Sequence, residues 1–77
     1  MENEHEQNRA LFFLSRNNLV HVKKKDGLFL NGTILEVGTD FFLIKDRLGK
    51  EYMIFFAELE KPLEVFHERG EGENGLE

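Results

Sequence analysis

Two glycines that lie five residues apart constrain the fold of this chain more than any other feature. Gly27 follows Asp26 between two β-favouring runs, and an Asp-Gly pair in that setting is a strong signal for a tight hairpin. Gly32 lies inside the second run, where a glycine weakens a strand unless the chain must bend or pack closely there. The pattern therefore predicts a small, curved sheet that contains a strand bent at Gly32.

The remaining pattern predicts one helix followed by strands. Ala10, Phe13 and Leu14 share one face of a helix at residues 3–16, and the Asn17-Asn18 pair ends that periodicity. From residue 19 onward the apolar positions mostly alternate, as they do in strands. We predict a mostly β domain in which this N-terminal α-helix precedes a five-stranded, strongly bent antiparallel barrel over residues 19–66. The expected strands cover residues 20–23, 28–37, 41–45, 51–56 and 63–66.

The chain has 77 residues and no cysteine. A domain of this size is marginal as a monomer, and because disulfides are excluded, oligomerisation is the expected source of further stability. The three histidines, His5, His21 and His67, are too scattered to predict a metal site, and no cofactor is expected. Residues 1–66 are interpreted as a single domain, and the acidic residues 67–77 as a flexible tail.

The net charge of −5 does not describe the predicted barrel, because residues 17–63 hold seven acidic and seven basic residues. No overall basic field therefore favours nucleic acid. The only basic cluster is Lys23-Lys24-Lys25, which could contact phosphates but is more simply the solvated side of a hairpin.

The sequence offers no support for an enzyme or a membrane protein. Ser15 is the only serine and falls on the predicted helix, and no histidine lies near a plausible nucleophile. No apolar run approaches the ~20 residues that a membrane-spanning helix needs. We therefore expect a cytoplasmic protein that is not an enzyme and has no membrane partner.

A helix followed by five strands, the second of them bent, resembles the Sm-like family, which includes the Sm and LSm proteins and the bacterial RNA chaperone Hfq. Lys25-Asp26-Gly27 is similar to the first hairpin turn of that family, and Gly32 matches the glycine of its bent strand. Residues 33–37 continue this strand, and the later strands are matched by residues 41–46, 52–59 and 63–66. The resemblance implies an SH3-like or Sm-like barrel.

The resemblance also implies a ring, because Sm-like proteins typically assemble about five to eight subunits by pairing the fourth strand of one copy with the fifth strand of the next. Independently of the family, residues 52–56 are uncharged and β-favouring, so they would be prone to aggregate as a bare sheet edge. We therefore predict a homo-oligomer whose subunit interface contains Tyr52, Met53, Ile54, Phe55, Phe56, Leu63 and Val65.

RNA binding is a further implication of the resemblance. Family members that bind uridine-rich RNA usually have an Asn after the third-strand turn and an Arg-Gly pair after the fourth strand, whereas this chain has Phe41 or Phe42 and Phe55-Phe56 at the matching positions. A phenylalanine can stack on a base, but at a strand end it more often belongs to a core or an interface. If RNA binds, the expected contacts are Lys23, Lys24, Lys25, Phe41, Lys45, Arg47, Lys50 and Phe55.

Two other functions remain open at this level. An oligomeric scaffold or protein-interaction module of the same fold would explain why the Asn and the Arg-Gly pair are missing. A monomeric SH3-like barrel that recognises peptides is less favoured, because of the N-terminal helix and the apolar fourth strand.

Overall fold

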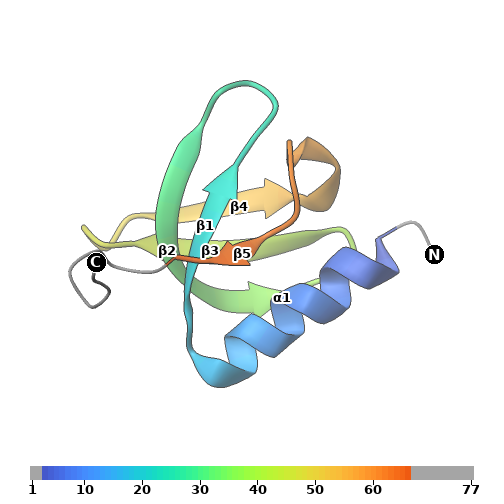
Figure 1. Cartoon of the computed structure of the whole chain (residues 1–77). Helices are drawn as coiled ribbons and strands as arrows, with labels where there is room; N and C mark the ends of the chain where they lie inside the picture. The colour runs from blue at the N-terminus through green and yellow to red at the C-terminus, as the bar shows by residue number, and fades with distance from the viewer. Residues whose placement is uncertain (1–2, 67–77) are drawn as a thin grey trace, which may run out of the picture.

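The computed structural model of the chain describes residues 3–66 (Figure 1). The predicted tail at residues 67–77 lies outside this range. The mostly β fold with an N-terminal helix is confirmed. In chain order, the described residues form α1 (Glu4–Arg16), β1 (Leu19–Lys23), β2 (Phe29–Val37), β3 (Phe41–Asp46), β4 (Glu51–Phe55), the 3-10 turn η1 (Phe56–Glu58) and β5 (Glu64–Val65).

The five strands form one antiparallel sheet in the order β4-β3-β2-β1-β5. This sheet is not closed, because β4 and β5 are its two edges and do not pair with each other within residues 3–66. β5 has only two residues, and both pair with β1, through Val20↔Val65 and His21↔Glu64. In the segment that connects β4 to β5, Leu59 forms an isolated β-bridge with Lys24, which follows the last residue of β1.

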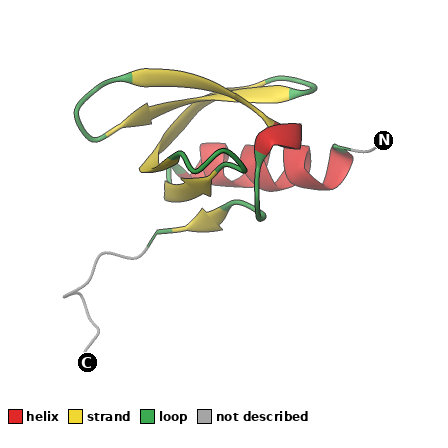
Figure 2. Cartoon of the chain, turned by 90° about the horizontal axis from the view of Figure 1, so that it is seen from above, coloured by secondary structure: helices red, strands yellow, loops and turns green. Residues whose placement is uncertain are grey.

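Helix α1 packs on the sheet, and two of its side chains donate to backbone carbonyls in the segments that precede β3 and β5. Asn17 adopts the left-handed conformation, with φ 56°, and ends the helix as the sequence predicts. The side chain of Gln7 donates to the carbonyl of Gly38 at 3.1 Å, and Nε of Arg9 donates to the carbonyl of Leu63 at 2.6 Å. Figure 2 shows α1 lying along the curved sheet. Among the described residues, no helix has the length and apolarity that crossing a membrane requires.

The core lies between α1 and the inner face of the sheet. Alternate residues of the strands enter it, as in Val20 and Val22 of β1 or Phe42 and Ile44 of β3, and all four are fully buried. The period of two that was seen in the sequence therefore corresponds to one buried face. The complete set of buried apolar residues is Ala10, Phe13, Val20, Val22, Ile34, Phe42, Ile44, Ile54, Phe56, Leu59 and Leu63.

Gly32 lies where the two halves of the sheet meet. It pairs with Val20 of β1 on one side and with Asp46 of β3 on the other. A Cβ atom at this position would overlap the backbone carbonyl of Lys45, so close approach of β3 explains the glycine. The register shifts between Ile34 and Glu36, and Figure 1 shows β2 curving strongly along its length.

Two hairpin turns of similar geometry connect β1 to β2 and β3 to β4. In the first, the N–H of Lys24 donates to the carbonyl of Leu28 at 2.8 Å, and Gly27 has φ 101°. In the second, the N–H of Asp46 donates to the carbonyl of Lys50 at 2.9 Å, and Gly49 has φ 91°. The positive φ explains why each turn needs glycine, and the hairpin predicted at Asp26-Gly27 is present.

Candidate interaction surface

The outer side of β4 is one of the two edges of the sheet. β4 pairs with β3 through Phe42↔Ile54 and Ile44↔Tyr52, and the N–H of Phe56 continues this side by donating to the carbonyl of Asp40 at 2.9 Å. Because successive strand residues direct their backbone groups to opposite sides, residues 51, 53 and 55 direct theirs away from β3. Within residues 3–66, no strand pairs with that side of β4.

The side chains beside this edge form an apolar strip on the outer face of the sheet. The strip consists of Phe41 and Leu43 in β3 and of Phe55 and Met53, which pair with them in β4. Met53 is 55% exposed and Phe55 is 45% exposed, while Phe41 and Leu43 are half-buried. The rings of Phe41 and Phe55 lie 6.2 Å apart. An exposed apolar strip along an unpaired strand is the arrangement that invites another strand.

The residues predicted for the subunit interface fall into two groups. Met53 and Phe55 present exposed side chains at the β4 edge, whereas Ile54, Phe56 and Leu63 are buried in the chain's own core. The hydroxyl of the half-buried Tyr52 donates to Asp46 at 3.3 Å, and the half-buried Val65 pairs with Val20 at the opposite edge of the sheet. Ile54 and Phe56 therefore offer a partner no exposed side chain, and their backbone groups face β3. β4 and β5 lie at opposite edges of the sheet, so one copy presents two separate contact edges.

The first group of predicted RNA contacts is largely neutralised by carboxylates. Nζ of Lys23 lies 3.5 Å from Glu60. Nζ of Lys24 lies 3.6 Å from Asp26 and 3.4 Å from Glu58. Lys25 is exposed, and it makes no ion pair with any residue in the range 3–66. Within residues 3–66, the cluster therefore offers one unpaired cation instead of three.

The carboxylate of Asp26 is bound into the same hairpin. It accepts the N–H of Leu28 at 2.9 Å, and this bond, aided by the nearby Lys24, lowers the pKa of Asp26. The carboxylate therefore stays charged near neutral pH and continues to offset the lysines.

The second group of predicted RNA contacts lies at the β3–β4 turn, at the opposite end of these strands from Phe41 and Phe55. The guanidinium of Arg47 lies 5.4 Å from the ring centroid of Phe66, and Nζ of Lys50 lies 5.5 Å from that of Tyr52. The structure therefore does not bring this second group of basic residues together with the two phenylalanines.

Asp46 sits at the centre of that turn. Its carboxylate accepts the N–H groups of Lys50 and Leu48 at 2.9 Å each, and it also accepts the hydroxyl of Tyr52. These bonds, led by the one from Lys50, lower the pKa of Asp46. A charged carboxylate beside Lys45, Arg47 and Lys50 weakens any attraction of phosphate to this end of the sheet.

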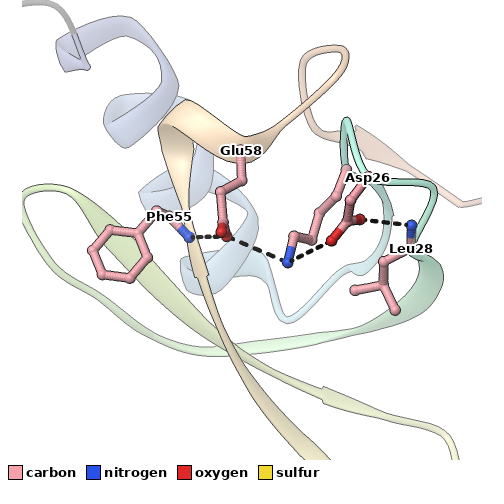
Figure 3. Close-up of polar contacts among 5 residues, drawn as sticks. Asp26, Leu28, Phe55 and Glu58 are labelled. Carbon is pink, nitrogen blue, oxygen red and sulfur yellow. Dashed lines mark hydrogen bonds and ion pairs between the residues drawn. The ribbon is translucent and has the colours of Figure 1, made fainter.

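Sequence reasoning missed the role of Glu58. Figure 3 shows its carboxylate between the edge of β4 and the first hairpin. Oε1 of Glu58 accepts the N–H of Phe55 at 3.2 Å and lies 3.4 Å from Nζ of Lys24. The only sequence signal is a carboxylate two residues after the predicted strand at 51–56, and Lys24 is too distant in sequence to be recognised as its partner.

No protein-family model matches the chain, and no curated protein matches it significantly. Among the described residues, no group of three or more His, Cys, Asp or Glu side chains is placed to hold a metal ion. The β4 edge and its apolar strip are therefore the candidate site.

Proposed function

We propose that this protein is a non-enzymatic, Sm-like assembly module that joins head to tail with copies of itself and closes into a ring. The observation that carries the proposal is the presence of two unequal open edges, β4 and β5, within residues 3–66 of one subunit. Two different edges on one subunit favour a heterologous contact, and such contacts form rings when the rotation closes. The strand order is also the one that an Sm-like subunit needs for joining its fourth strand to the fifth strand of a neighbour.

The apolar strip explains why the contact would be favourable. Met53 and Phe55 expose a large part of their side chains, and a neighbouring strand would remove that apolar surface from water. The same strand would satisfy the outward backbone groups of Glu51 and Met53. Burial of the strip and pairing of the edge therefore act in the same direction.

Assembly without RNA is better supported than assembly that binds RNA. Lys23 and Lys24 are each paired with carboxylates, and Asp46 lies among the second set of basic residues. Phosphate contacts contribute most of the affinity for nucleic acid, so paired cations contribute little. We infer a scaffold or protein-interaction role and retain RNA binding as the alternative.

Sedimentation velocity at micromolar concentration tests the assembly. The wild-type chain has a mass of 9.0 kDa, and we expect a species at least about five times heavier. Phe55→Asp places a charge in the apolar strip and should return the protein to monomer mass. Leu48→Asp is the matched control, because Leu48 is 93% exposed but lies in the β3–β4 turn, away from the strip. A wild-type monomer, or equal masses for wild type and Phe55→Asp, would refute the proposal.

Fluorescence anisotropy with oligo-uridine and oligo-adenosine at low salt decides between scaffold and RNA-binding roles. We expect no saturable binding at tens of micromolar protein. Saturable binding that is weakened in Lys25→Ala would favour the RNA-binding alternative, since Lys25 is the cluster's unpaired cation among residues 3–66.

A further inference from the structure

The end of the β4 edge is already occupied by a side chain of the same molecule. Residues 51, 53 and 55 direct their backbone groups away from β3. Of these, the N–H of Phe55 donates to Oε1 of Glu58 at 3.2 Å. A partner strand that extended along β4 as far as Phe55 would need the N–H of Phe55 as a free donor, but this N–H is already bonded to the Glu58 carboxylate.

Glu58 is held in this position from two sides. Its backbone carbonyl accepts the N–H of Lys25 at 2.9 Å, which fixes η1 against the first hairpin. Its carboxylate lies 3.4 Å from Nζ of Lys24, whose side chain is only 17% exposed and also approaches Asp26. Figure 3 shows that Glu58 and Asp26 belong to one chain of polar contacts that reaches from Phe55 to Leu28. The position of the Glu58 carboxylate at the β4 edge is therefore fixed by contacts of both its backbone and its side chain.

We propose that Glu58 caps the β4 edge and competes with the incoming strand of a neighbouring copy for the N–H of Phe55. This inference rests on the proposed self-assembly through β4. An incoming strand would bring a carbonyl oxygen to this N–H, and a carbonyl and a carboxylate are both acceptors, so they cannot share the position favourably. The Glu58 cap thus restricts pairing to Glu51 and Met53 and weakens the association of subunits.

Removing the cap should strengthen assembly. In Glu58→Ala, the N–H of Phe55 becomes available to the neighbour, and one added backbone hydrogen bond tightens association by about fivefold. Glu60→Ala is the matched control. Glu60 forms a similar ion pair, at 3.5 Å, with Lys23 of the same lysine cluster, but its carboxylate does not cap β4. Glu58→Gln keeps an acceptor oxygen and should leave the cap in place.

Two measurements test the cap. Amide hydrogen exchange in dilute, monomeric protein should show exchange of the Phe55 N–H at least about tenfold faster in Glu58→Ala than in wild type, and unchanged in Glu60→Ala and Glu58→Gln. Sedimentation should show tighter association for Glu58→Ala alone. If Glu58→Ala does not fold, Lys24→Met retains the carboxylate but removes the group that holds it, and should shift both measurements in the same direction.

The outcomes separate this inference from the proposed function. Unchanged protection of the Phe55 N–H in a folded Glu58→Ala would overturn the cap itself. Faster exchange with equal or weaker association would overturn the competition while the assembly proposal stands. If wild type and all variants remain monomers, the assembly proposal fails and the competition fails with it.

Discussion

The two edges of the sheet are built in opposite ways. β4 is five residues long, and its outer side chains include the exposed Met53 and Phe55. β5 has two residues, and its exposed Glu64 forms an ion pair with Lys61 at 2.8 Å, which lowers the pKa of Glu64. Short length and charge are common devices that protect an edge from unwanted pairing. β5 has both, whereas along most of its length β4 has neither.

This difference shows where association would be driven and how far it would extend. The apolar strip supplies the surface that would gain from burial, so the favourable free energy of the proposed contact would come from its β4 side. β5 offers only a short segment for backbone pairing. The Glu58 cap leaves the outward backbone groups of Glu51 and Met53 open on β4.

The largest effect is expected from changing the inner face of β4. Ile54 is 1% exposed, so Ile54→Ala should lower the free energy of unfolding by about 2–5 kcal/mol through lost burial and a cavity. Met53→Ala, one residue away on the outer face, should change the stability of the monomer by less than about 0.5 kcal/mol. Urea denaturation, at protein concentrations too low for association, measures the change in the free energy of unfolding for both variants.

This pair of variants tests whether the two faces of β4 are distinct. Met53→Ala should instead weaken association at higher protein concentration. Similar losses of monomer stability in both variants would mean that β4 is buried on both faces, and the contrast between the two edges would be lost.

A smaller effect is expected at Gly32, which joins the half of the sheet that carries β5 to the half that carries β4. Because an added Cβ would overlap the backbone of Lys45, Gly32→Ala should lower the free energy of unfolding by about 1–3 kcal/mol. Glu36→Ala, at an exposed position of the same strand, is the control and should change stability by less than about 0.5 kcal/mol. Equal denaturation midpoints for Gly32→Ala and wild type would show that β2 and β3 can separate without cost.

The local features of the fold could be predicted from the sequence. Asn17 ends the helix, Asp26-Gly27 forms the first hairpin, and the alternation of apolar residues marks the core face. Each of these depends on neighbours in the chain. The pattern also predicts the apolar fourth strand, but it assigns the whole run at residues 52–56 to the subunit interface. Alternation within that run distinguishes the buried Ile54 from the exposed Met53.

The candidate site was harder to predict, because its defining contacts join residues that are distant in sequence. Nothing near Lys24 indicates that Glu58 neutralises it, and nothing near Phe55 indicates that its N–H is capped from η1. β5 is also shorter than predicted, with two residues where the sequence pattern indicates four, 63–66. A sequence pattern gives the approximate position of a strand, but its paired length depends on its neighbour.

The smallest effect concerns Asp46 in the turn that leads into β4. Its pKa in the folded protein is lowered, chiefly by the N–H of Lys50, so its stabilising contribution is complete above the ordinary carboxyl pKa of about 3.9 and is lost as pH falls through the folded value. Asp46→Ala should therefore be less stable than wild type at pH 7, and the gap should close as pH falls from about 5 to about 2. Leu48→Ala, in the same turn, should show no such pH dependence. Denaturation midpoints across this range measure the gap. A gap that stays constant would mean that the carboxylate's charge contributes nothing to positioning β4, leaving the backbone of the turn to set the edge.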